Sequence, residues 1–222
     1  MVNLRLKIGA SILSADFSRL GEELKRVENA DLLHFDVMDN QFVDNLTFGP
    51  PVLKSLKTSL LKDCHLMVSN PLKLVKPLKI AGADLITFHC EVCKNDKELM
   101  QIIEAIKSEG MKVGIALNPD TKLERIESVL DKVDLVLCMT VFPGFEGQKF
   151  MEKVMPKIQE LRKKFGKDIQ VDGGIDNETI KVCAKAGANV FVSGSHIFKS
   201  SNPKETIKLL KKNAANNSFF NN

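Results

Sequence analysis

The chain has 222 residues, 44% of them hydrophobic and 27% charged, with a formal net charge of +4. This length suits one domain with a single large core, and the small positive excess contains no basic block dense enough for a nucleic-acid track. The opening residues hold no apolar run of signal-peptide length, and no later segment approaches the ~20 apolar residues that cross a bilayer. We therefore expect a cytoplasmic protein with neither a nucleic-acid nor a membrane partner.

Eight apolar runs with strand character alternate with helical patterns along the chain. They span residues 7–13, 32–38, 63–68, 85–90, 112–117, 135–141, 169–172 and 190–193. Residues 96–109 form one of the clearest helical patterns, because four apolar residues recur at helical spacing before Gly110 provides a stop. Segments that end a helix and enter a strand repeat at about twice the ~25–30 residues of one βα unit.

Strict alternation of buried strands and amphipathic helices predicts a parallel sheet that is covered on both faces. Eight repeats favour closure into a (β/α)8 TIM barrel, an α/β fold, over an open doubly wound sheet. We expect one catalytic barrel domain over residues 1–212. The Asn-rich residues 213–222 are expected to be a disordered tail.

Polar residues end several of these strands, where the active site of such a barrel lies. His34 and Asp36 are two residues apart on the second strand, so the strand period sends both side chains to the same side. His65 ends the third strand and Asp172 ends the seventh. Two histidines and two carboxylates are a plausible ligand set for one divalent metal ion, with Zn, Fe(II), Mn and Co all compatible.

Other residues near the strand ends allow two readings. Met38, Met67 and Met139 are either core residues or a deformable apolar layer that shields a reactive carbon from water. His89 on the fourth strand and His196 after the eighth are isolated in the sequence, and we interpret both as structural residues.

Glycine-containing loops follow the sixth, seventh and eighth strands. They contain Gly144, Phe145, Glu146 and Gly147, then Gly173 and Gly174, then Gly194 and Ser195. Glycine lets backbone N–H groups approach a dianion, and the loops after strands seven and eight are a common phosphate site in barrels. Three such loops in succession favour a phosphate site over three unrelated turns.

Ordered motifs in this chain resemble the signatures of the ribulose-phosphate 3-epimerase family over about residues 7 to 212. They are Ser11-Ile12-Leu13-Ser14-Ala15-Asp16-Phe17, His34-x-Asp36-Val37-Met38-Asp39, His65-Leu66-Met67-Val68, Pro143-Gly144-Phe145, Gly147-Gln148-Lys149-Phe150 and Val171-Asp172-Gly173-Gly174-Ile175. The resemblance implies a ribulose-phosphate-binding barrel that interconverts D-ribulose 5-phosphate and D-xylulose 5-phosphate in the pentose phosphate pathway. It also implies a homo-oligomer, either a dimer or a hexamer.

The same resemblance assigns roles to individual residues. Asp36 matches the proton acceptor and Asp172 the proton donor, and both match metal ligands together with His34 and His65. Ser11, His65 and Asp172 match substrate contacts. The phosphate cradle is matched by Gly144, Phe145, Glu146, Gly147, Gly173, Gly174, Gly194 and Ser195. One metal ion and no organic cofactor are expected.

Three positions depart from the family pattern. Asn40 stands where many members have Gly, Phe142 where many have Glu, and Glu146 where a second Gly is usual. A carboxylate that faced a phosphate would be unfavourable, so we expect the Glu146 side chain to point to solvent while its backbone N–H serves the site.

Three competing functions are weighed against the epimerase. An orotidine-type decarboxylase has Lys two residues after a strand-terminal Asp, whereas this chain has Met38 there. A non-catalytic phosphosugar-binding protein would need neither the metal ligands nor the paired carboxylates. An allulose-6-phosphate 3-epimerase shares both the reacting carbon and the phosphate, and it stays open as the alternative.

Overall fold

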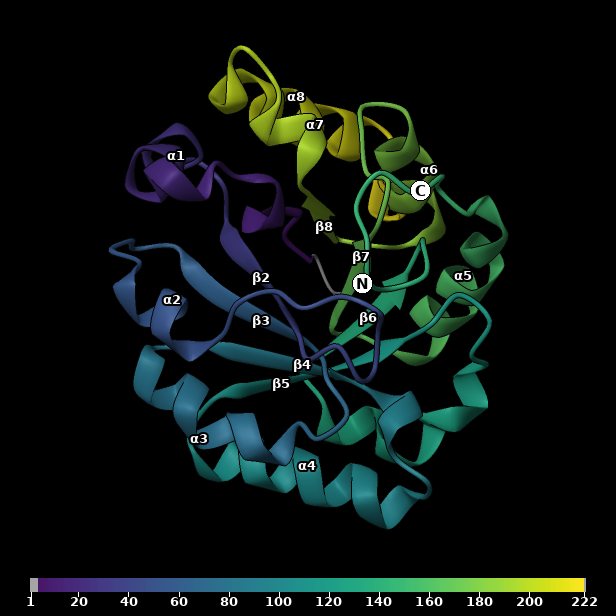
Figure 1. The fold of residues 1–222 in the computed structure, drawn as a ribbon. Coiled ribbons are helices and arrows are strands. Elements are labelled where there is room, and N and C mark those ends of the chain that lie inside the picture. The colour runs from purple at the N-terminus through teal and green to yellow at the C-terminus, as the bar shows by residue number, and fades with distance from the viewer. Residues whose placement is uncertain (1–3, 222) are drawn as a thin grey trace.

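The computed structural model describes residues 4–221, which form a closed barrel of eight parallel strands inside a ring of helices (Figure 1). The strands are β1 Lys7–Ser11, β2 Leu32–Met38, β3 Leu61–Met67, β4 Leu85–His89, β5 Lys112–Leu117, β6 Leu135–Met139, β7 Asp168–Asp172 and β8 Val190–Ser193. Each strand pairs with the next, and β1 pairs with β8 with Lys7 opposite Val190. The predicted (β/α)8 barrel is confirmed.

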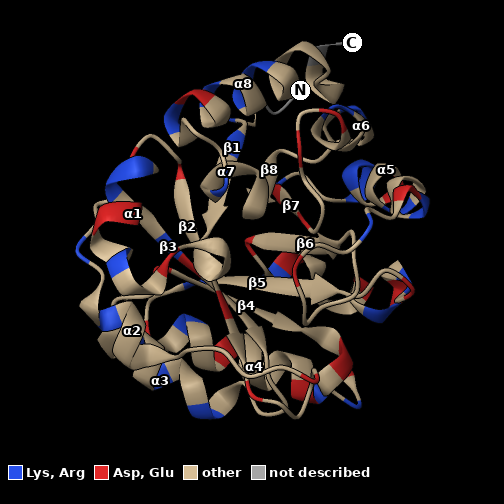
Figure 2. Ribbon diagram, turned by 45° about the horizontal axis from the view of Figure 1, so that its top comes forward, with Lys and Arg blue, Asp and Glu red and all other residues tan. Residues whose placement is uncertain are grey.

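Helices follow most of the strands and carry much of the charge on their outer faces (Figure 2). They are α1 Leu20–Arg26, α2 Pro50–Ser55, α3 Leu72–Ala81, α4 Asp96–Ser108, α5 Met155–Lys164, α6 Thr179–Ala186, α7 Ser195–Phe198 and α8 Pro203–Asn216. Short 3-10 turns are η1 Ile12–Ser14, η2 Phe17–Arg19, η3 Cys90–Val92, η4 Leu123–Arg125, η5 Glu127–Lys132, η6 Glu152–Val154 and η7 Phe219–Asn221. Within residues 4–221, none of the helices has the length and apolar character needed to cross a membrane.

The sequence pattern explains the limits of α4. The Asn95 side chain caps its start by accepting a hydrogen bond of 3.1 Å from the Glu98 N–H. Its apolar stripe is buried against the barrel, and the left-handed Gly110 follows its end. The predicted helix and the observed one differ by a single residue.

Strand ends differ from the predicted runs where the chain turns inward over the barrel mouth. The run predicted for 7–13 ends at Ser11, because Ile12–Ser14 form a 3-10 turn. The run at 135–141 ends at Met139. In contrast, β3 begins at Leu61, earlier than predicted, since Leu61 pairs with Leu32 of the neighbouring strand.

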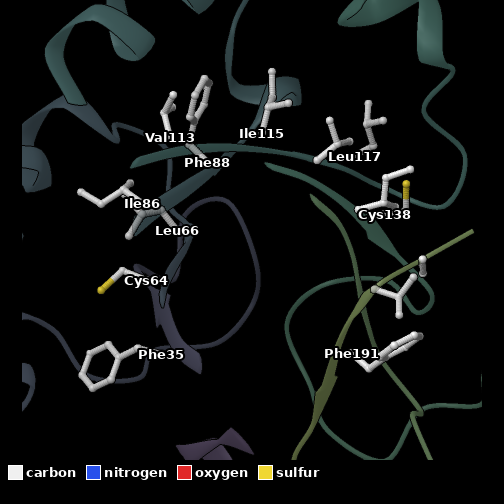
Figure 3. Close-up of a cluster of buried hydrophobic side chains, with 14 of the residues drawn as sticks. Phe35, Cys64, Leu66, Ile86, Phe88, Val113, Ile115, Leu117, Cys138 and Phe191 are labelled. Carbon is white, nitrogen blue, oxygen red and sulfur yellow. The ribbon is translucent and has the colours of Figure 1, made fainter. Parts of the chain in front are cut away.

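Alternation along the strands separates an apolar outer layer from the interior of the barrel. Phe35, Leu66, Phe88 and Phe191 are fully buried in the cluster of apolar side chains between the strands and the helices (Figure 3). The residues that alternate with them include polar side chains that are also buried: His34 and Asp36 on β2, His65 on β3, and Thr87 and His89 on β4. The fold therefore places histidines and carboxylates inside the barrel.

The end of the chain is more ordered than expected. Helix α8 runs past residue 212 to Asn216, and it buries Ala214 fully. Ser218 is also buried beyond the helix. The boundary that we expected at residue 212 thus does not coincide with the end of an element, and the first residues of the expected tail are helical.

Candidate active site

The four predicted metal ligands lie together inside the barrel. His34 and Asp36 come from β2, His65 from β3 and Asp172 from β7. One ligand atom of each lies within 4.8 Å of the others. The first three residues are buried, while the Asp172 side chain is 18% exposed and reaches toward the barrel mouth. We call these four residues the cluster.

Distances within the cluster fit a single tetrahedral ion. The His34 Nε2 atom lies 3.3 Å from Asp36 Oδ1 and 3.5 Å from Asp172 Oδ2. The His65 Nδ1 atom lies 3.1 Å and 3.6 Å from the same two oxygens, and 3.4 Å from His34 Nε2. Ligands bonded tetrahedrally at about 2.0–2.2 Å are about 3.3–3.6 Å apart. The donor set therefore fits a divalent transition metal with little rearrangement.

The electrostatics of the cluster favour a positive charge between its residues. Burial of the His34 imidazole lowers its pKa, but the nearby carboxylates of Asp36 and Asp63 hold that pKa well above its ordinary value. Burial of the Asp36 carboxyl raises its pKa, yet His34 and His65 hold it far below its usual range. Asp36 is thus ionised at neutral pH, and a proton or a metal ion would be stabilised beside it.

The Asp63 carboxylate, which lies outside the cluster, orients the His34 ring. The His34 Nδ1 atom is 2.8 Å from Asp63 Oδ2, and the Gln170 amide donates to the same oxygen at 2.6 Å. A carboxylate only accepts, so His34 Nδ1 carries a proton, and in the neutral imidazole, the form that binds a metal ion, Nε2 presents its lone pair to the cluster. Such outer partners orient metal-binding imidazoles and raise their basicity.

His65 is held by His89, for which the sequence predicted a structural role. Its Nε2 atom lies 2.9 Å from His89 Nε2, and His89 Nδ1 lies 3.1 Å from Glu91 Oε2. Burial lowers the pKa of His89 to about 4, although Glu91 opposes the shift. His89 is therefore a neutral link between the cluster and Glu91.

Ser11 fixes the carboxylate of Asp36. Its hydroxyl donates to Asp36 Oδ2 at 2.6 Å, which leaves Oδ1 directed at the two histidines. Ser11 ends β1 and also lines the cavity above the cluster. Ser11 thus faces the cavity, where its role as a substrate contact stays a prediction, and its hydrogen bond to Asp36 was not predicted from the sequence.

A cavity of about 380 Å³ opens above the cluster at the carboxyl ends of the strands. Asp36 and Asp172 form part of its floor. Its walls include every residue predicted for the phosphate cradle: Gly144, Phe145, Glu146, Gly147, Gly173, Gly174, Gly194 and Ser195. The size suits a small ligand.

Two of these glycines leave no room for a side chain with the neighbouring side chains in their present positions. Gly173 has a φ of 115°, and a Cβ atom there would lie 2.4 Å from Val141 Cγ2. Gly194 follows β8, and a Cβ atom there would lie 2.6 Å from Ser14 Oγ. Side chains at these positions would therefore displace the cavity wall.

The expectation for Glu146 is wrong in part. Its side chain is exposed, but it lines the cavity, and its carboxylate accepts a hydrogen bond from the Ser14 hydroxyl. The contact joins the loop after β6 to the loop after β1 across the barrel mouth. A favourable partner on the opposite wall thus draws the carboxylate inward.

The other two departures are accommodated locally. Asn40 has a φ of 55°, the left-handed conformation that Gly adopts freely and that Asn tolerates better than most residues. Phe142 is exposed and lines the cavity, while its carbonyl accepts from the Gln148 amide at 2.6 Å.

The three methionines line the same cavity. Met38 and Met67 pack with Val43 in a small buried group, and Met139 belongs to the apolar group inside the barrel. They are thus both core residues and cavity walls, while the shielding of a reactive carbon from water stays a prediction.

Two cavity residues were not predicted for this role. Lys199 and His196 both line the cavity near the loop after β8. The buried Nε2 atom of His196 has no hydrogen-bond partner among the described residues. Both residues lie within four positions of Ser195 in the sequence. This closeness to a predicted site residue is the signal that could have identified them as cavity residues.

Fold and site together define a class: a (β/α)8-barrel enzyme with paired carboxylates beside two histidines, a set that could hold a metal ion. The Ribulose-phosphate 3 epimerase family model matches residues 7–198. The chain is 48% identical over 214 residues to a ribulose-phosphate 3-epimerase, cytoplasmic isoform, of Oryza sativa subsp. japonica, with 93% of each chain covered. It is 44% identical over 216 residues to that of Bacillus subtilis, covering 93% of this chain and 98% of the relative.

The chain therefore belongs to the ribulose-phosphate 3-epimerase family. Among solved structures, 3-hexulose-6-phosphate synthase from Salmonella typhimurium has a TM-score of 0.72 and 18% identity, with 96% of this chain and all 100% of that one covered. A likeness at that identity supports the barrel fold alone.

Proposed function

We propose that this protein interconverts D-ribulose 5-phosphate and D-xylulose 5-phosphate by moving the proton at carbon 3. The observation that carries the proposal is the placement of Asp36 and Asp172. Their carboxylates come from β2 and β7, lie beside the same two histidines, and face one cavity of phosphosugar size. Membership of the epimerase family supports the same conclusion.

The reaction needs one group to remove the carbon 3 proton and another to return a proton from the opposite face. Asp36 is ionised at neutral pH and serves as the proton acceptor, while Asp172 in its protonated form serves as the donor. The roles exchange when the reaction runs in reverse. Ser11 holds one Asp36 oxygen and so aims the other.

His34, Asp36, His65 and Asp172 are proposed to hold one divalent metal ion, with Zn, Fe(II), Mn and Co as candidates. When bound, the metal supplies Lewis-acid stabilisation of the negative charge that develops on the substrate oxygens. The methionines above the cluster exclude water from the reacting carbon. No organic cofactor is required.

Substrate phosphate is proposed to bind at the loops after β6, β7 and β8. Gly144, Gly173 and Gly194 let backbone N–H groups approach the dianion, and Lys199 adds a positive charge to the wall. We propose further that the catalytic domain predicted for residues 1–212 also includes the rest of helix α8 as far as Asn216, that the protein forms a homo-oligomer and that it acts in the cytoplasm.

Purified protein tests the proposal when its metal content is analysed and its activity is measured on two substrates. We expect about one metal ion per chain and faster turnover of D-ribulose 5-phosphate than of D-allulose 6-phosphate. Preference for D-allulose 6-phosphate would favour the alternative epimerase. A metal-loaded structure with the four side chains more than ~3 Å from the ion would contradict the ligand set.

A further inference from the structure

A chain of buried hydrogen bonds runs outward from the cluster. His65 Nε2 lies 2.9 Å from His89 Nε2, and His89 Nδ1 lies 3.1 Å from Glu91 Oε2. Both imidazoles are fully buried. The far oxygen of Glu91 accepts from the Asn118 backbone N–H at 2.7 Å and from the Thr121 hydroxyl at 2.5 Å. Every member of this chain has a partner on each side.

Glu91, at the outer end of this chain of hydrogen bonds, determines which atom donates in each of them. Hydrogen bonds to His89, Thr121 and Asn118 hold the pKa of Glu91 down to about 2 despite its burial, so Glu91 is ionised and can only accept. His89 Nδ1 must therefore carry the proton. Its Nε2 atom then has a lone pair and accepts from His65 Nε2.

These hydrogen bonds determine whether His65 Nδ1, the nitrogen that faces the cluster, carries a proton. With a proton on Nε2, the neutral imidazole has none on Nδ1, and this is the atom that lies 3.1 Å from Asp36 Oδ1 and 3.4 Å from His34 Nε2. A metal ion binds only a nitrogen whose lone pair is free. The arrangement keeps that lone pair directed into the cluster.

We propose that His89 and Glu91 are positioning residues, which fix the tautomer of His65 so that its Nδ1 lone pair faces the metal site. The inference rests on the proposed metal-binding role of the cluster. It differs from a packing role, although the Phe42 ring also covers His89 with ring centroids 4.8 Å apart. Packing depends on shape, whereas the tautomer depends on which atom donates.

The substitution Glu91→Gln separates shape from direction, because it replaces one oxygen by an NH2 group of similar size. The Asn118 N–H can only donate, so the Gln carbonyl must take the outer position and the NH2 group must face His89. That group donates to His89 Nδ1, so the His89 proton moves to Nε2. His89 Nε2 then donates to His65 Nε2, which is the reverse of the direction in the parent protein. His65 then carries its proton on Nδ1, where it opposes a metal ion.

The experiment measures Zn²⁺ affinity by competition with a chromophoric chelator. We expect Glu91→Gln to bind Zn²⁺ about 10–100-fold more weakly than the parent protein. Thr121→Val is the matched control, because it removes one hydrogen bond to the same carboxylate without reversing any donor. Its Zn²⁺ affinity should stay within about threefold of the parent value, since the His65 lone pair is unchanged.

A second readout does not depend on the variant. The chain has four histidines, so their ring nitrogens can be assigned by ¹⁵N NMR of the labelled parent with Zn²⁺ bound, where the ion replaces any proton between His65 Nδ1 and Asp36 Oδ1. We expect the His89 proton on Nδ1 and a His65 proton on Nε2. A His89 proton on Nε2 in the parent would overturn the inference, even if Glu91→Gln does not fold.

The outcomes separate this inference from the proposed function. A parent that binds Zn²⁺ together with a folded Glu91→Gln variant of equal affinity overturns the positioning role alone. A parent that does not bind Zn²⁺ overturns the proposed metal site, and the inference with it. Equal weakening in Glu91→Gln and Thr121→Val would show that general loss of stability, and no tautomer, controls binding.

Discussion

One carboxylate oxygen of Asp36 lies within 4.8 Å of one of Asp172, although the two residues belong to strands on different parts of the barrel. The path around the ring from β7 to β2 passes through β8 and β1. Both carboxylates face the same cavity from different directions. A ligand between them can lose a proton to one and receive a proton from the other.

The substitution Asp172→Asn should uncouple these two events. In deuterated water with D-ribulose 5-phosphate, Asp36 can still remove and replace the carbon 3 proton on its own face. We expect deuterium uptake at carbon 3 with epimerisation slowed by about 10²-fold or more. Mass spectrometry and a coupled assay for D-xylulose 5-phosphate measure the two processes.

Metal content must be equal in the parent and in Asp172→Asn, since the residue is also a proposed ligand. A metal-loaded variant that epimerised at near the parent rate would contradict the two-carboxylate mechanism. Another acid such as His65 would then have to act.

The cradle predicts that Gly194→Ala raises the KM for the phosphorylated substrate. The added Cβ atom would lie 2.6 Å from Ser14 Oγ and would push the loop after β8 away from the loop after β1. We expect KM to rise about tenfold, the equivalent of one lost hydrogen bond of about 1.4 kcal/mol, with a smaller change in kcat.

Gly21→Ala is the matched control for this glycine. Gly21 lies in α1, and a Cβ atom there has no other heavy atom within 4 Å. The substitution should leave KM unchanged and raise the free energy of unfolding by up to about 1 kcal/mol. Unchanged KM in both variants would contradict the phosphate site.

Glu146→Gly should strengthen binding of the phosphate. The Glu146 carboxylate lines the cavity and contacts Ser14, so it opposes a dianion bound nearby. Removal of a unit charge about 4 Å from a dianion in water changes the binding free energy by about 2 kcal/mol, or roughly thirtyfold in KM before screening by salt. Glu146→Gln removes the charge but keeps the contact with Ser14, and its KM should fall as well. A rise in KM for both variants would show that the carboxylate assists binding.

The lowered pKa of Glu91 predicts that the free energy of unfolding falls in acid. Its pKa is about 2 in the folded protein, below the ordinary value of 4.5, so the folded state binds fewer protons between these values. The stability that it contributes, about 3 kcal/mol, is complete above pH 4.5 and disappears as the pH falls toward 2. Urea unfolding of the metal-free protein should show this slope in the parent and a smaller one in Glu91→Gln.

Glu104→Gln on the exposed face of α4 is the control for the acid prediction, because it removes a carboxylate that makes no buried hydrogen bond. It should keep the slope of the parent. Equal slopes in the parent and Glu91→Gln would contradict the buried ionised state of Glu91.

Much of the barrel could be predicted because its local signals agree with its global packing. Val113 and Ile115 alternate with small residues along β5, and the apolar stripe of α4 has the period of a helix. His34 and Asp36 could be placed on one side by the period of a strand alone. The strand-end rule then selected His65 and Asp172, which the structure brings to the same point.

The hydrogen bonds between side chains on different strands could not be predicted, because they depend on the register of neighbouring strands. The register of β3 and β4 pairs His65 with Thr87, and this places His89 where its ring reaches the ring of His65. His89 is the last residue of β4, so the strand-end rule could have selected it. Contact between Ser14 and Glu146 depends on two loops that sequence patterns do not position.

Closure of the barrel by β1 and β8 has a consequence for synthesis on the ribosome. The first strand leaves the ribosome early, but its partner at Val190 is made near the end of translation. At about 5–20 residues per second, one edge of β1 waits roughly 10–40 s for the strand that covers it. An open apolar edge invites pairing with other chains. We infer that the nascent chain passes through a period of exposure to aggregation, which slow translation would lengthen and a chaperone bound to that edge would relieve.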